Sequence, residues 1–230
     1  MLQQTQVARV VDRWASFLDE FPDPATCAAA GPAAVVRAWS GLGYNRRATM
    51  LHGAAETIVA RHGGRVPSEL DALLALLALP GVGPYTARAV RAFAFEERAA
   101  PVDTNIGRVL ARVDGVRLSP AEAQRTADHL VGALPDGSTW RWNQALMELG
   151  ATVCTTRRPD CGRCPLGRAC SWHGGDGPGP TADPAVGSAA AVDTLGPRES
   201  RVLDGLVDDG LVAVEDGVVR LVGDPLSPAP

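Results

Sequence analysis

Four cysteines in the last third of the chain are the residues whose type and spacing point most directly to chemistry. They follow the pattern Cys154-x6-Cys161-x2-Cys164-x5-Cys170, which places four thiols within seventeen residues. In a cytosolic protein, thiols this close together are far more often metal ligands than disulfide partners. Zinc sites usually present their ligands as close pairs, whereas four thiolates separated by unequal loops are compatible with a [4Fe-4S] cluster. The spacing alone therefore favours iron and sulfide and leaves zinc as the alternative.

The carboxylate of Asp103 is a second candidate for chemistry. It directly precedes a predicted helix in Pro-Val-Asp-Thr-Asn-Ile, and Asp is a common N-cap residue at such a position. A cap holds its carboxylate in a fixed place, so a capping role and a catalytic role are compatible.

A glycine-rich bend lies twenty residues ahead of this carboxylate. A Leu-rich segment stops at Pro80, Gly81 and Gly83 flank Val82, and Pro84 opens a new apolar-periodic run. Proline is tolerated in the first turn of a helix, so the pattern predicts a helix, a bend and a second helix. Glycines allow the backbone to approach another molecule, and the N–H groups at a helix N-terminus suit a phosphate. An ordinary helix-helix turn is the alternative that these residues leave open.

Four separated motifs carry a resemblance to a known family. The segments Leu79-Pro-Gly-Val-Gly-Pro-Tyr-Thr-Ala87 and Val102-Asp-Thr-Asn-Ile-Gly-Arg-Val109 resemble the helix-hairpin-helix and catalytic-Asp segment of the DNA glycosylase superfamily that includes endonuclease III and the A/G-mismatch adenine glycosylases. The opening Met-Leu-Gln-Gln-Thr-Gln-Val and the later Trp39-Ser-Gly-Leu-Gly-Tyr-Asn45 resemble the adenine-specific branch. The similarity covers residues 1–172. It implies an all-α, two-lobed helix-hairpin-helix glycosylase fold with a C-terminal [4Fe-4S] loop.

The resemblance also implies an activity and its residues. The family hydrolyses N-glycosidic bonds in DNA, here to remove adenine mispaired with guanine or 8-oxoguanine. The oxocarbenium character that develops at the sugar would be stabilised, or attacked, by the carboxylate of Asp103. Tyr85 and Asn105 would orient that carboxylate or the sugar, and Gln144 matches a position that faces the extruded base.

The expected partner is double-stranded DNA containing a mismatch, bound by a monomer. In the family, the position of Gln4, with Gln3 beside it, enters the base stack next to the mismatch, and Tyr44 matches an aromatic wedge. From the residues alone, two glutamines at a helix start are simply polar, and Tyr44 could equally lie in the core. The remaining predicted DNA contacts are the bend of Gly81, Val82 and Gly83 and the arginines Arg157 and Arg158.

The cysteine spacing is the same as that of the family's cluster. The resemblance therefore implies a [4Fe-4S] cluster held by Cys154, Cys161, Cys164 and Cys170. We expect this cluster to fix the loop that carries Arg157 and to take no redox step in excision.

The chain contains no lysine. An arginine side chain stays protonated and cannot form a Schiff base, so lyase chemistry through a lysine side chain is excluded. Tyr85 occupies the place where endonuclease III-like enzymes carry a Lys after the hairpin glycines. We therefore expect a monofunctional glycosylase.

The sequence departs from the family at its start. The family motif reads Glu-x-Met-Leu-Gln-Gln-Thr, and its Glu protonates the adenine; that position falls two residues before Met1. One hypothesis is that translation starts upstream, so that this Glu and the residues that complete the core are encoded; the other is that the protein lacks its general acid. We favour the first, because an internal Met is easily mistaken for a start.

Composition and charge agree with a helical DNA-binding protein. Apolar residues make up 46% and aromatic residues 5%, and alanine is abundant, which favours tightly packed helices. The net charge of −4 is uneven: residues 1–175 carry 19 arginines against 16 acidic residues, and residues 176–230 carry 3 against 10. The arginines at 157, 158, 163 and 168 predict a phosphate contact, with a solvated loop as the alternative. With neither a membrane-spanning run nor a signal segment, we expect a cytosolic protein.

Periodicity predicts the elements that position these residues. Helices are expected at 1–21, across an Ala-rich stretch containing a buried, inert Cys27, at 33–39, from Arg46 to Val59, at 68–79 with Ser68 as N-cap, and from the capping box of Ser119 to Leu134. A last helix runs from Trp140 to Gly150, where glycine is expected to end it.

We predict a helical glycosylase domain at 1–173, a flexible linker at 174–197 and a small winged-helix-like fragment at 198–222. The linker is rich in Gly, Pro, Ala and Asp. The fragment has a helix from Arg198, followed by two alternating runs around Asp216-Gly217 that are typical of a hairpin.

Two other functions remain open from the sequence. The first is a thymine glycosylase acting on G/T mismatches, because some relatives share a Tyr after the hairpin glycines. The second is a catalytically silent iron–sulfur DNA-binding module, which the absence of the Glu would favour.

Overall fold

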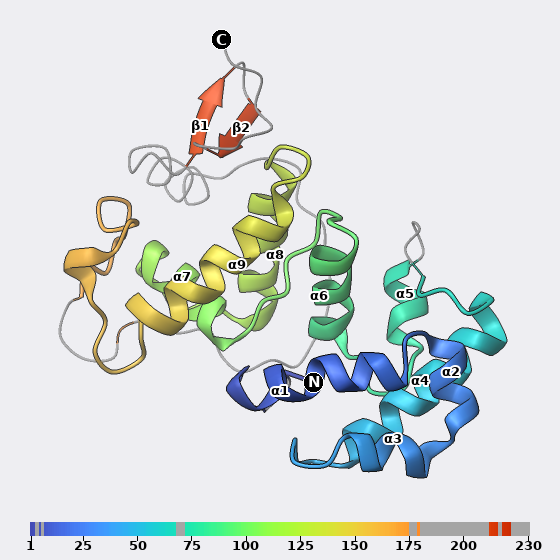
Figure 1. Ribbon diagram of the computed structural model, residues 1–230. Helices are drawn as coiled ribbons and strands as arrows, with labels where there is room; N and C mark the ends of the chain where they lie inside the picture. The colour runs from blue at the N-terminus through green and yellow to red at the C-terminus, as the bar shows by residue number, and fades with distance from the viewer. Residues whose placement is uncertain are drawn as a thin grey trace. The chain divides into compact units, whose positions relative to one another are not determined.

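The structure is a computed structural model, and it describes residues 1–2, 5, 7–67, 72–174, 179, 212–215 and 218–221. The chain divides into two compact units, Met1–Ala87 and Arg88–Pro230. The expected helical architecture is confirmed (Figure 1). In chain order the elements are α1 (Val7–Glu20), α2 (Pro24–Ala30), α3 (Pro32–Ala38), α4 (Arg46–His62), α5 (Ala72–Leu77), α6 (Pro84–Ala94), α7 (Thr104–Asp114), α8 (Pro120–Gly132), α9 (Thr139–Glu148), a π-helical turn η1 (Leu149–Val153), a 3-10 turn η2 (Cys161–Arg163), β1 (Val212–Glu215) and β2 (Val218–Leu221).

The first unit packs α2 and α3 against α4. Asp23 caps α2 by accepting the backbone N–H of Thr26 at 2.7 Å, and a proline opens both α2 and α3, as the first turn of a helix allows. The core that forms between these helices and α1 is built from Val10, Phe17, Phe21, Cys27, Val35, Trp39, Leu42, Ala48 and Ala55. Cys27 is buried in this core, as predicted.

The apolar stripe predicted for the first helix is only partly buried. The helix begins at Val7 and not at Met1, and its Val10 and Phe17 enter the core. The neighbouring positions Val7, Val11, Trp14 and Leu18 are exposed. Periodicity locates an apolar face, but it does not say how much of that face is covered.

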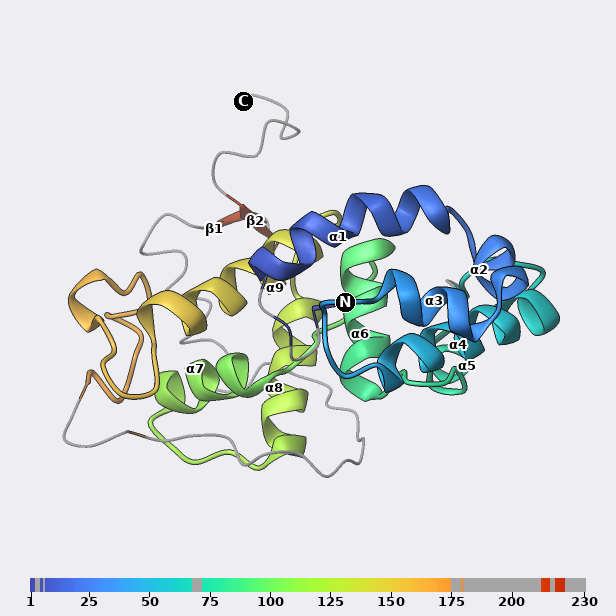
Figure 2. The same ribbon diagram turned by 60° about the horizontal axis from the view of Figure 1, so that its bottom comes forward.

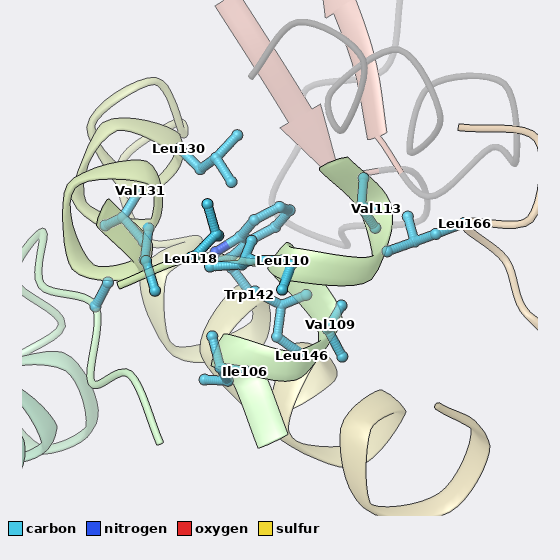
Figure 3. Packing of buried hydrophobic residues seen from close by; sticks show 14 of the residues in the cluster. Ile106, Val109, Leu110, Val113, Leu118, Leu130, Val131, Trp142, Leu146 and Leu166 are labelled. Carbon is cyan, nitrogen blue, oxygen red and sulfur yellow. The ribbon is translucent and has the colours of Figure 1, made fainter. Parts of the chain in front are cut away.

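Helix α7 is the centre of the second unit. Each residue from Ile106 to Asp114 is buried, because α8, α9 and η1 pack around the helix. Figures 1 and 2 show α7 beside α8 and α9. The apolar residues that close this core, drawn in Figure 3, include Ile106, Val109, Leu110, Val113, Leu118, Leu130, Val131, Trp142, Leu146 and Leu166.

Two helix starts in this unit were predicted correctly from local sequence. Asp103 is the N-cap of α7, and its side chain accepts the backbone N–H of Ile106. Ser119 and Glu122 form a complete capping box at the start of α8. Both signals lie within four residues of chain, which is why the sequence is sufficient to reveal them.

The prediction that Gly150 ends the last helix was wrong. Helix α9 ends at Glu148, and the chain continues through the π-helical turn η1, which contains Gly150. A Cβ added at Gly150 would lie 2.7 Å from the Cβ of Asn105. The glycine is therefore required for close packing against α7 and does not terminate a helix.

The predicted C-terminal hairpin is confirmed, because β1 and β2 pair in antiparallel register with Val214 opposite Val219. The helix predicted from Arg198 and the predicted N-cap Ser68 lie outside the described residues, as does the linker apart from Gly174 and Gly179. Over the part of the chain that is described, no helix combines the length and the apolar character needed to cross a membrane.

The bend between α5 and α6 offers a matched pair of glycine substitutions. Gly81 has φ of +76°, and a Cβ there would lie 2.8 Å from the Cβ of Met50. The carbonyl of Gly83 accepts the first helical bond of α6 from Ala87, and space around Gly83 is open. We expect Gly81→Ser to lower the free energy of unfolding by about 2 kcal/mol, because both the backbone and the packing are strained.

Gly83→Ser is the control, since serine is a favourable N-cap residue and should change this free energy by less than about 0.5 kcal/mol. Urea unfolding followed by circular dichroism measures both variants. Equal losses for the two substitutions would contradict this account of the bend.

Candidate active site and nucleic-acid interface

The carboxylate of Asp103 is fixed by its own helix. One oxygen accepts the N–H of Ile106 at 2.8 Å, and the other accepts the side-chain amide of Asn105 at 3.1 Å. The positive end of the helix dipole also favours a negative charge at this position. Asp103 is partly exposed, so the structure provides an oriented carboxylate that a ligand can approach.

A buried arginine holds the residue that orients this carboxylate. Arg108 is only 6% exposed, and its guanidinium donates to the side-chain oxygen of Asn105 at 2.9 Å. The same group donates to the carbonyl of Gly150 at 2.6 Å and to the carbonyl of Cys154 at 2.9 Å. We call Asp103, Asn105 and Arg108 the Asp103 network. It connects the start of α7 with η1 and with the first cysteine.

Burial lowers the pKa of the Arg108 guanidinium from its usual value, and the Arg112 charge acts in the same direction, whereas Cys154 and Asp103 oppose the change. An arginine remains protonated even so, and the network therefore contains a fixed positive charge. Sequence reasoning missed Arg108, Arg112 and the packing role of Gly150. The available signal was a pair of arginines four residues apart on a helix that is otherwise rich in apolar residues.

The four cysteines face one small cavity, which Trp172 and His173 also line. All four are free thiols, and the loop that carries them follows η1 in the orange part of Figure 2. Partial burial raises the pKa of the Cys161 and Cys164 thiols, and the neighbouring cysteines raise it further. The four cysteines thus line one cavity, and their role as ligands of a bound group stays a prediction.

The cysteine cavity suits a thiolate-bound group. Arg112, 1% exposed, donates to the Cys154 Sγ at 3.3 Å, and a thiolate is the better acceptor for such a donor. Across the described residues, no three Cys, His, Asp or Glu side chains are arranged around a single metal ion. The four sulfur atoms are donors of the kind that a soft metal group requires, but the side chains are not gathered around the position of a single ion.

Arg112 also fixes the backbone of the cysteine loop. It donates to the carbonyls of Thr155 at 2.8 Å and Thr156 at 3.1 Å, and it stacks on the Trp172 ring at 4.2 Å. The arginines at 157, 158, 163 and 168 are all exposed on this loop. The Nη1 of Arg163 lies 3.6 Å from the Oδ2 of Asp160. Arg112 thus holds the loop from its buried side, and the loop presents four other arginines to solvent.

The structure gives the exposure and the local contacts of the other predicted site residues. Tyr44 is 65% exposed, which excludes the core alternative. Tyr85, in the first turn of α6, belongs to the first unit, and Asp103 belongs to the second.

Gln144 is half-buried on α9, and its amide donates to Glu148 at 2.9 Å. In the bend, Gly81 and Gly83 are exposed and Val82 is half-buried.

Gln3 and Gln4 lie outside the described residues, so their predicted contacts stay predictions.

Comparison with known families places the chain in a class of DNA repair proteins. The family model described as HhH-GPD superfamily base excision DNA repair protein matches residues 1–132, more than half of the chain. The chain belongs to this superfamily.

Curated relatives refine this assignment. The chain is similar to the adenine DNA glycosylase of Mycolicibacterium smegmatis, with 45% identity over 84% of the chain and 65% of the relative. It is 46% identical to the Mycobacterium tuberculosis adenine DNA glycosylase over 77% of the chain and 60% of that protein. The chain thus spans less than two thirds of the length of these relatives.

Among solved structures, a thermostable thymine-DNA glycosylase is similar, with a TM-score of 0.66 and 28% identity over 75% of the chain and 80% of that protein.

Proposed function

We propose that this protein is a monofunctional DNA glycosylase, a hydrolase that removes adenine mispaired with guanine or 8-oxoguanine. The observation that carries the proposal is the Asp103 carboxylate, which is partly exposed and has one oxygen fixed by Ile106 and the other by Asn105. The adenine DNA glycosylases among the relatives support the choice of base.

The proposed chemistry uses charge in a fixed position. Breaking the bond between the base and C1′ leaves positive charge on the sugar, and a nearby carboxylate stabilises that charge or attacks the carbon. Asp103 supplies the negative charge, and Asn105 sets the direction of its oxygens. One water molecule is consumed in the reaction: its hydroxyl ends on C1′, and its proton balances the one that the departing base takes up. We assign Tyr85 to the same orienting role, on the resemblance alone.

The absence of lysine limits the chemistry that can occur after excision. Without a side-chain amine to form a Schiff base, the product is an intact abasic site and not a nicked strand. This is the physical basis for proposing a monofunctional enzyme.

Double-stranded DNA with a mismatch is the proposed partner of a monomer. The exposed glycines of the bend suit a phosphate, and the exposed Arg157 and Arg158 add positive charge on the cysteine loop. Tyr44, with Gln3 and Gln4, is proposed to enter the base stack. Gln144 is proposed to face the extruded adenine, which requires it to exchange its bond to Glu148 for one to the base.

A thymine glycosylase acting on G/T mismatches is the second candidate, because a thymine-DNA glycosylase is among the similar structures. Duplexes with A opposite 8-oxoguanine, A opposite guanine and T opposite guanine distinguish the two. A silent DNA-binding module would bind all three duplexes and cleave none.

The cysteine cavity is proposed to hold a [4Fe-4S] cluster through Cys154, Cys161, Cys164 and Cys170. When bound, the cluster would tie the two ends of the arginine-bearing loop together. Arg112 would donate to one of its thiolate ligands and limit access of water.

Asp103→Asn should abolish adenine release and spare DNA binding. The amide keeps a side-chain oxygen for the N–H of Ile106, so α7 stays capped, but the negative charge is lost. We expect the single-turnover rate on A opposite 8-oxoguanine to fall at least about a thousandfold, with the dissociation constant within about threefold of wild type. Alkaline cleavage of the abasic product and fluorescence anisotropy measure the two quantities. Retained excision would refute the role of Asp103.

Purified protein should contain about four iron and four acid-labile sulfide per chain. Cys164→Ser should lower both, because serine is a poor ligand for iron in such a cluster. Anaerobic purification followed by metal and sulfide analysis tests this expectation. Stoichiometric zinc without sulfide would show that the alternative metal is the correct one.

A further inference from the structure

The guanidinium of Arg47, in the first turn of α4, joins two segments that are far apart in the sequence. On one side it donates to the carbonyl of Met1 at 2.8 Å and to the hydroxyl of Thr5 at 2.7 Å. These two residues flank Gln3 and Gln4 in the sequence. Arg47 on α4 thus binds two of the described residues that precede α1, Met1 and Thr5.

On the other side, Arg47 organises the loop that carries Tyr44. It donates to the carbonyls of Leu42 and Gly43, each at 3.1 Å. Its guanidinium carbon lies 5.2 Å from the ring centre of Trp39 and 5.6 Å from that of Tyr44. The loop is therefore held through its backbone and through its exposed ring.

Two further bonds stiffen the same assembly. The hydroxyl of Thr5 donates to the carbonyl of Leu42 at 3.1 Å, and the indole N–H of Trp39 donates to the carbonyl of Gly43 at 3.1 Å. Both loop carbonyls that accept from Arg47 thus have a second donor. Such shared acceptors leave the loop little freedom to move alone.

Tyr44 has a strained backbone and an exposed side chain. Its φ is +50°, a left-handed conformation that costs a non-glycine residue about 1 kcal/mol or more, and 65% of the residue is exposed. Strain of this kind persists only where the surroundings impose it, and it concentrates at functional positions. The contacts of Arg47 supply that constraint.

We propose that Arg47 is a positioning residue that fixes the Tyr44 ring, together with the backbone of Met1 and the side chain of Thr5, so that the ring is oriented for entry into the DNA base stack. This inference rests on the proposed function. A planar guanidinium is needed because Nη1 donates to Met1, the two hydrogens of Nη2 are shared among three oxygens, and the flat face lies against two rings. A lysine ammonium offers three donors on one atom and no flat face.

The test compares Arg47→Lys with Arg46→Lys, which makes the same change at the adjacent, exposed arginine. Hydrogen exchange of the free protein, followed by mass spectrometry, reports the rigidity of residues 1–7 and 39–45 without any DNA. Fluorescence of 2-aminopurine placed beside the mispaired adenine reports base unstacking, and single-turnover excision reports the outcome.

For Arg47→Lys we expect the backbone amides of both segments to exchange at least about fivefold faster. The 2-aminopurine fluorescence at saturating protein should fall to less than about half of the wild-type signal. Single-turnover excision should be about tenfold slower. The dissociation constant should change by less than about threefold, because one positive charge is kept. Arg46→Lys should behave as wild type in all of these measurements. Adding Tyr44→Ala to Arg47→Lys should cost little more than Tyr44→Ala alone, since both act on one ring.

Thr5→Val provides a second variant if Arg47→Lys lowers the unfolding midpoint. It removes the hydroxyl that accepts from Arg47 and donates to the carbonyl of Leu42, but it leaves the bonds of Arg47 to Leu42 and Gly43 in place. Exchange and fluorescence should therefore move in the same direction by a smaller factor. Unchanged exchange in residues 39–45, an unchanged 2-aminopurine signal, or equal effects of Arg46→Lys would each overturn the proposal. If the wild-type protein released no adenine, the proposed function would fail, but exchange and fluorescence would still decide the role of Arg47.

Discussion

The charge of Arg108, buried inside the second unit, is the constraint on which the proposed site depends. A buried charge is costly unless its hydrogen bonds are met, and here the acceptors come from three places: the side chain of Asn105 on α7, the carbonyl of Gly150 in η1 and the carbonyl of Cys154. Satisfying one guanidinium therefore fixes the spacing of three segments. One of these segments orients the carboxylate of Asp103.

The same helix performs a second task one turn further on. Arg112 reaches the carbonyls of Thr155 and Thr156 and the sulfur of Cys154, so two arginines of α7 hold both the proposed active carboxylate and the cysteine loop. A group bound by the cysteines would then stabilise the loop from its far side and, through the carbonyl of Cys154, support Arg108. Under the proposed function, the cysteine site therefore has a structural role and needs no redox step.

The parts of the fold that could be predicted from sequence were those encoded locally. The cap at Asp103 and the capping box at Ser119 each depend on neighbours within four residues, and the cysteine spacing is a local pattern as well. The role of Gly150 could not be predicted, because it depends on contact with a helix more than forty residues earlier. Buried Arg108 was missed for the same reason, since its acceptors are mainly backbone carbonyls that carry no sequence signature. The exposure of Tyr44 required coordinates, because a tyrosine on a glycine loop suits either a core or a surface.

The central claim is that the Asp103 network sets the direction of the carboxylate, and Asn105→Ala tests it most directly. This variant keeps the Cβ that packs against Gly150 and removes only the amide between Asp103 and Arg108. The account predicts that single-turnover release of adenine opposite 8-oxoguanine falls about a hundredfold while DNA affinity stays within about threefold of wild type. A wild-type rate at saturating protein would contradict it.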